Sequence, residues 1–156
     1  IKYLVMTLFE QISQDIMASM KARDAVRTNT LRNIKKEFIE AKTAPSSNGE
    51  LSDADAFKII AKMVKKGKDA ADIFVQNNRQ DLADEELAQV KVMEEYLPKA
   101  LSLEEVKEAV LKVVAEVGAT SLKDMGKVMG AANKALAGQA DGKTISGVVK
   151  EVLSSL

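Results

Sequence analysis

Five lysines in the last third of the chain are spaced so that they could bind an anionic partner. At 100° per helical residue, Lys123, Lys127 and Lys134 fall within about 40° of one another. Lys143 and Lys150 share one face of the next predicted helix in the same way. Flexible ammonium groups neutralise phosphates without reading bases. These two lysine-bearing faces are therefore suited to the backbone of a nucleic acid.

Three glycines strengthen this interpretation. Gly126 and Gly130 flank lysines of the first face, and Gly147 lies between the lysines of the second. Because glycine has no side chain to hold a rigid partner away, we expect a partner to approach closely at these positions. A structural alternative stays open, since lysines opposite an apolar stripe are also what any exposed amphipathic helix shows.

The composition removes most catalytic chemistry. The chain has no His, no Cys and no Trp. Without Cys there is no disulfide, zinc finger, iron–sulfur cluster or thiol nucleophile. Without His, the side chain that titrates nearest neutrality is missing, and with it most triads and acid–base pairs. Carboxylate or lysine catalysis and a magnesium site are what remain, and we expect no catalytic residue, no metal and no cofactor.

The carboxylates support that expectation. Four of them crowd the first turn of a predicted helix, where the helix dipole favours acids, and they show neither EF-hand spacing nor a DxD-type motif: Asp81, Asp84, Glu85 and Glu86. Glu94 and Glu95 are adjacent, so on a helix they point about 100° apart and make no acid–base pair. Gly126-Lys127 and Gly142-Lys143 lack the upstream glycine and strand of a phosphate-binding loop.

Hydrophobic periodicity predicts an all-α fold. A 3.6-residue period recurs along the whole chain, and no two-residue alternation appears. The pattern predicts helices over residues 7–21, 24–42, 52–76, 81–97, 102–117, 121–136 and 141–156. Pro98 ends the fourth helix, because the residue before a proline resists helical geometry. We therefore expect an N-terminal subdomain of about four helices (residues 1–98) and a C-terminal three-helix subdomain (residues 99–156).

Particular residues mark the ends and faces of these helices. Ser52, Ser102, Ser121 and Asp141 are the predicted N-terminal caps, and Gly118 is the predicted terminator of the fifth helix. The predicted apolar stripes include Met20, Leu87 and Leu103. Gly67 falls inside the apolar stripe of the third helix, where glycine costs about 1 kcal/mol relative to alanine. We expect a close helix crossing at Gly67, where a side chain would not fit.

The net charge is zero, with 23 basic and 23 acidic residues, but the charges are segregated. Residues 21–42 hold seven basic and three acidic side chains, whereas residues 69–95 hold eight acidic and two basic ones. The balance is thus no argument against an anionic partner. Four Phe and two Tyr offer little surface for base stacking, which favours a structured RNA recognised by shape and backbone.

No apolar run approaches the length of a membrane span, so we expect no membrane partner. The first residues lack the features of a signal peptide, and Met6 resembles a natural start. Residues 1–5 are therefore predicted to be an upstream extension, and the expected location is the cytoplasm.

Longer motifs resemble a known family. The stretches Asn78-Arg-Gln-Asp-Leu-Ala83, Glu94-Glu-Tyr-Leu-Pro98 and Gly118-Ala-Thr-Ser-Leu-Lys-Asp-Met-Gly-Lys-Val-Met129 resemble signatures of the YqeY family of small bacterial proteins. The resemblance extends over the chain from Met6, although Gly130 stands where a larger residue is usual. This family is similar to the C-terminal tail of GatB, a subunit of the tRNA-dependent amidotransferase. The resemblance implies an all-helical fold whose three-helix tail contacts tRNA.

Three functions follow as hypotheses. The first is a non-catalytic tRNA-binding module, accessory to amidotransferase or aminoacylation machinery. The second is a protein–protein adaptor with a partner in the translation machinery and no nucleic-acid role. The third is carbon–nitrogen ligase activity with glutamine as amide donor, which rests on family association alone. That reaction needs an activated nucleophile and phosphate chemistry, and the chain shows no such constellation.

Overall fold

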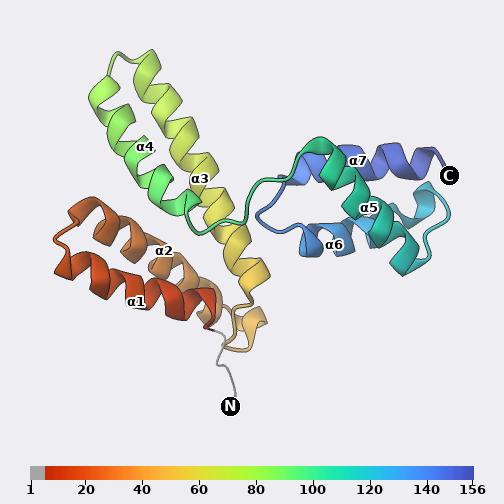
Figure 1. Cartoon of the computed structure of the whole chain (residues 1–156), viewed down its shortest axis with the longest axis horizontal. Helices are drawn as coiled ribbons and strands as arrows, with labels where there is room; N and C mark the ends of the chain where they lie inside the picture. Colours follow the sequence, from red (N-terminus) through yellow and green to blue (C-terminus); the bar gives the residue numbers. More distant parts are fainter. Residues whose placement is uncertain (1–5) are drawn as a thin grey trace. The chain divides into compact units, whose positions relative to one another are not determined.

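The computed structural model of the protein describes residues 6–156, which are helical without any strand (Figure 1). The predicted all-α fold is confirmed, while the predicted extension at residues 1–5 lies outside the described residues. Seven α-helices and two 3-10 turns follow one another: α1 (Leu8–Lys21), α2 (Ala25–Thr43), η1 (Pro45–Ser47), α3 (Asp53–Gln76), α4 (Gln80–Glu94), α5 (Leu103–Val117), η2 (Leu122–Asp124), α6 (Met125–Ala135) and α7 (Gly142–Ser154). They form two compact units, of which one ends at Leu97 and the other begins at Pro98.

The N-terminal unit consists of two helical hairpins, α1 with α2 and α3 with α4 (Figure 1). Its core holds five large side chains with no solvent exposure: Ile12, Leu31, Ile34, Phe38 and Ile60. Helix α2 packs against α4, so one apolar cluster joins both hairpins. Burial of this apolar surface is the main force that holds the two hairpins together.

Gly67 occupies the close crossing of α3 and α4. A Cβ atom built on Gly67 would lie 2.5 Å from Cγ2 of Val90 on α4. Real Cβ atoms do not approach another carbon so closely, so any larger residue would force the two helices or the valine to move. The crossing expected at this position is confirmed.

The Glu94-Glu-Tyr96 motif fixes the end of α4 to the other three helices of its unit. Glu94 pairs with Lys68 of α3 at 3.3 Å, and Glu95 pairs with Arg27 of α2 at 2.6 Å. Tyr96 donates its hydroxyl hydrogen to Asp15 of α1 at 2.5 Å. Three consecutive residues thus reach three different helices. This gives the motif a structural role within the N-terminal unit.

Helix α4 is shorter than the periodicity indicates. It ends at Glu94 and not at Leu97, because the next three N–H groups donate to carbonyls only three residues back. This tighter turn leads the chain to Pro98, whose ring is incompatible with a helical residue before it.

Substituting Tyr96 with Phe should lower the free energy of unfolding by about 1 kcal/mol, because the half-buried hydroxyl bridges Asp15 and Arg27. Burial, together with the hydrogen bond to Asp15, raises the pKa of Tyr96 above its ordinary value of 10.0. The folded state therefore favours the neutral hydroxyl, and this stabilisation is present below pH 10 and lost as pH rises. Urea unfolding at pH 7 and pH 10.5 should show the variant's deficit shrinking at the higher pH. A deficit that is the same at both would contradict this role.

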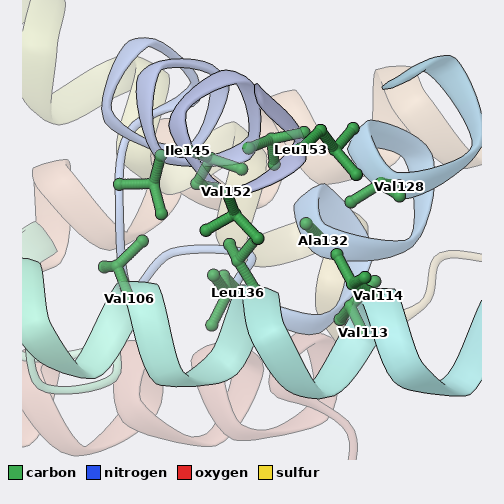
Figure 2. Packing of buried hydrophobic residues seen from close by; sticks show 12 residues of the cluster. Val106, Val113, Val114, Val128, Ala132, Leu136, Ile145, Val152 and Leu153 are labelled. Carbon is green, nitrogen blue, oxygen red and sulfur yellow. The ribbon is translucent and has the colours of Figure 1, made fainter. Parts of the chain in front are cut away.

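The C-terminal unit is a three-helix bundle with a valine-rich core. Figure 2 shows side chains of α5, α6 and α7 meeting between the helices, among them Val106, Val128 and Val152, which are at most 2% exposed. The segment before α5 joins this unit through the N–H of Leu101, which donates to the carbonyl of Gln139 at 2.9 Å. Every helix of the unit thus contributes one apolar face to a single core.

Side-chain caps begin the helices largely where the sequence predicts them. The Ser52 and Ser102 hydroxyls accept hydrogen bonds from the third N–H of α3 and α5, and the Asp141 carboxylate does the same for α7. Ser121 differs, because its capping box with Asp124 opens the 3-10 turn η2. Helix α6 therefore begins at Met125, four residues beyond Ser121.

Candidate nucleic-acid interface

Helix α6 separates an apolar face from a lysine face. Val128 and Ala132 have no solvent exposure, and Leu136 just beyond the helix is 4% exposed. Lys127 and Lys134 lie about 20° apart on the opposite side of the helix and are exposed. Their shared face follows directly from the amphipathic pattern.

Lys123 does not belong to that helix. It lies in η2, where the backbone turns by about 120° per residue, so its predicted alignment with Lys127 and Lys134 does not hold. The Asp124 carboxylate causes this local change by accepting from the N–H groups of Thr120 at 2.9 Å and Ser121 at 3.4 Å. Lys123 is still exposed, next to the start of α6.

Helix α7 repeats the arrangement of α6. Ile145, Val149 and Val152 are buried against α5 and α6, whereas Lys143 and Lys150 are exposed and lie about 20° apart. Because α6 and α7 pack against each other, both lysine-bearing helices belong to one rigid bundle. We call Lys127 with Lys134 and Lys143 with Lys150 the two lysine faces.

Neither lysine face forms an ion pair within the described residues. No carboxylate between residues 6 and 156 forms an ion pair with any of the five predicted site lysines, and the ion pair of this unit joins Lys107 to Glu151. Asp124 and Asp141 are nearby, but both cap backbone N–H groups. The hydrogen bond from the Thr120 N–H lowers the pKa of Asp124, and the one from the Thr144 N–H lowers the pKa of Asp141.

The three glycines lie in open space. A Cβ atom built on Gly126, Gly130 or Gly147 would meet nothing within 4 Å. The glycines are therefore not needed for packing inside the protein, in contrast to Gly67. They leave the backbone of α6 and α7 accessible beside the lysines.

The acidic side chains make no comparable centre. Arg79 pairs with Asp81 at 2.9 Å, and the Gln80 amide donates to Asp84 at 2.8 Å, so half of the predicted acidic cluster is held by local contacts. No group of three His, Cys, Asp or Glu side chains suitable for a metal ion occurs in residues 6–156. Over the same range, no helix is long and apolar enough to cross a membrane.

The fold and these surfaces define a two-unit, all-helical protein whose C-terminal bundle carries basic faces. Comparison with known families agrees with this class, because the model of the Yqey-like protein family matches residues 9–153. The chain belongs to the YqeY family, as its motifs indicate.

Fungal proteins are among its relatives. One is the protein "Altered inheritance of mitochondria protein 41, mitochondrial" of Kluyveromyces lactis, 31% identical over 142 residues, or 89% of this chain and 72% of the relative. A protein of the same name from Pyrenophora tritici-repentis is 26% identical over 93% of this chain and 80% of its own length. The homologue from Vanderwaltozyma polyspora matches 55% of this chain and 46% of its own length at 28% identity.

These names correct one expectation. The cytoplasmic location expected from the sequence is wrong by this comparison, since the relatives are named as mitochondrial proteins. The expectation rested on the absence of a signal peptide and of a membrane span. Neither feature distinguishes the cytoplasm from the interior of an organelle.

Proposed function

We propose that this protein is a non-catalytic module that binds tRNA or another structured RNA through the lysine faces of α6 and α7. The observation that carries the proposal is the combination, on α6 and α7, of exposed lysines without an ion pair in the described residues and glycines beside which a Cβ would meet nothing within 4 Å. On α3, by contrast, Lys65 pairs with Asp69 and Lys68 pairs with Glu94, and Gly67 is closed off by Val90. Unpaired lysines beside open backbone leave positive charge available to an external anion.

The similarity between the YqeY family and the tRNA-contacting tail of GatB also supports an RNA partner. The lysine faces lie in the three-helix bundle that corresponds to that tail. In this proposal the protein is an accessory to amidotransferase or aminoacylation machinery and itself performs no amide transfer. The sequence contains no Cys and no His, so the thiol nucleophile and the imidazole base that could serve glutamine hydrolysis are missing.

A protein–protein adaptor is the second candidate. The open glycines of α6 and α7 favour it as much as they favour RNA, because a partner helix packs closely where side chains are small. Unpaired lysines are less suited to this role, since burying them in an interface requires matching acids on the partner.

Removing the lysine faces should weaken RNA binding and reduce its salt dependence. In a variant with Lys127, Lys134, Lys143 and Lys150 all changed to Gln, the slope of log affinity against log salt should fall by about one for each lost phosphate contact. Filter binding of labelled tRNA between 50 and 300 mM salt measures both quantities. The matched control removes four charges from α3 as Lys58, Lys62, Lys65 and Lys66 to Gln, and it should bind nearly as the wild type does.

Two outcomes would count against RNA binding by these faces. One is a wild-type affinity no higher than that of a neutral control protein. The other is an equal loss in the α3 control, which would show a general charge effect. The adaptor is favoured if the wild type retains a protein partner from nuclease-treated extract and the α6–α7 variant does not. In that case the wild type should also show no affinity for RNA.

A further inference from the structure

The turn after α1 places an arginine where the backbone favours glycine. Arg23 has φ 57°, its N–H donates to the Met20 carbonyl at 3.1 Å, and the next N–H donates to Ser19 at 3.0 Å. Helices α3 and α5 end in the same hydrogen-bond pattern, with Asn78 (φ 56°) and Gly118 (φ 67°) at the left-handed position. Glycine and asparagine are the residues this position normally holds. An arginine with left-handed geometry is strained, and the hydrogen bonds of the turn hold it there, so its side chain is a place to look for a function.

Arg23 lines a surface hollow together with a second arginine. The hollow has a volume of about 310 Å³, and its walls include Met20, Asn29 and Arg32. Arg32 reaches back toward the end of α1, where its Nη2 lies 3.5 Å from the Met20 sulfur. Arg23 and Arg32 therefore border the same hollow, and Arg32 also contacts the Met20 side chain. We call this place the arginine hollow.

The two arginines of the hollow are free to bind an external anion. Three of the chain's four arginines fall between residues 23 and 32. Arg27 binds Glu95 and Arg79 binds Asp81, whereas neither Arg23 nor Arg32 pairs with a carboxylate of residues 6–156. Asp24 also borders the hollow, but its Oδ1 accepts the N–H of Arg27 as the cap of α2.

We propose that the arginine hollow binds a phosphate group of an RNA backbone, so that the N-terminal unit makes its own contact with the RNA. The planar guanidinium matches a phosphate with two parallel hydrogen bonds, which makes a pair of free arginines a phosphate site. Because every wall residue named above is exposed, an isolated phosphate ion would be held weakly. We assign the phosphate to a polynucleotide, because an RNA is the partner in the proposed function. This inference rests on the proposed function.

The test combines Arg23→Gly with Arg32→Gln in the full-length chain and measures tRNA binding as a function of salt. Affinity should fall roughly ten-fold, and the salt slope should decrease by about 0.9, the value for one phosphate contact in a duplex. The control variant Lys58→Gln with Lys66→Gln removes the same charge from α3 and should change neither value. Arg23→Gly alone should raise the melting temperature by roughly 2 to 6 °C, because glycine relieves the strained backbone.

A substitution of Arg23 that raises stability and lowers RNA affinity indicates a binding role for this residue and not a structural one. If Arg23 served only the fold, replacing it with Gly would lower the melting temperature or leave the RNA affinity unchanged, and either result overturns the proposal. Comparing the arginine variant with the lysine variant distinguishes a failure of this inference from a failure of the proposed function. Loss with the lysine variant alone overturns the arginine hollow, loss with the arginine variant alone overturns the lysine faces, and loss with neither overturns both.

A second arm tests another source of phosphate. Vesicles of phosphatidylcholine with 30% phosphatidylserine, probed by co-sedimentation, should retain little protein, and the double arginine variant should behave as the wild type does. Vesicle binding that is lost in this variant while RNA affinity is unchanged would assign the hollow to lipid and overturn the proposal.

Discussion

Gly67→Ala should destabilise the N-terminal unit by up to about 2 kcal/mol, although alanine is the better helix former. The added Cβ would lie 2.5 Å from Cγ2 of Val90, and overpacking of this kind typically costs 1–3 kcal/mol. The gain of about 1 kcal/mol in helix propensity offsets part of that cost. Valine cannot easily turn aside, because its branched side chain has one strongly preferred rotamer in a helix. Urea unfolding of the full-length chain measures the loss.

A double-mutant cycle with Val90→Ala tests the cause. Val90→Ala alone removes the two buried methyl groups and should itself be destabilising. In that background the contact is gone, so adding Gly67→Ala should be neutral or stabilise by up to about 1 kcal/mol. Gly147→Ala is the control for propensity alone, since a Cβ at Gly147 meets nothing within 4 Å. If Gly67→Ala costs the same with and without Val90, the contact is not the reason for the glycine.

Gly67 also illustrates what a sequence reveals about a fold. A glycine inside an apolar stripe is unfavourable for the isolated helix, so its presence indicates a neighbour that needs the space. The caps were predictable for a similar reason, because Ser or Asp at a helix start acts on N–H groups only two or three residues away. Caps and a glycine inside an apolar stripe can both be recognised within one short stretch of sequence. They are therefore predictable without knowing which distant helices meet.

Several residues of the predicted apolar stripes are exposed, among them Met20 at 52%, Leu87 at 44% and Leu103 at 67%. Met20 and Leu103 lie in the last turn of α1 and the first turn of α5, where each helix extends past its core. Helix α4 contacts both α2 and α3, and its buried face includes Ala83 and Val92. Periodicity gives the direction of an apolar face, but which turns are covered depends on helices distant in the sequence.

The two candidate sites also differ in how far the sequence predicts them. Exposure of the lysine faces was predictable, because it follows from the apolar stripe on the opposite side of each helix. The arginine hollow was not predictable, because it depends on the left-handed turn at Arg23 and on Arg32 reaching back to Met20. The available signal was the placement of three of four arginines within ten residues. Such a cluster marks a place to inspect and does not reveal which arginines are already paired.

Replacing both interior glycines of the lysine faces with alanine should stabilise the C-terminal unit by about 2 kcal/mol. Gly130 and Gly147 each cost about 1 kcal/mol relative to alanine, and a Cβ at either position meets nothing within 4 Å. Gly126 lies in the first turn of α6, where less is gained, so it stays unchanged. Thermal and urea unfolding of the full-length chain should both show the increase. An unchanged or lower stability would contradict the open surroundings of these glycines.

The same positions test whether a partner comes close to the backbone. If RNA lies against the lysine faces, its affinity should fall in the order Gly, Ala, Gln at positions 130 and 147, because each step adds bulk without charge. Stability should follow a different order, with Ala highest, Gln next and Gly lowest, because Gln is a good helix former. Since binding and folding rank the three residues differently, a loss of affinity cannot result from unfolding. Equal RNA affinities for all three, measured by filter binding at one salt concentration, would show that the glycines are not contact points.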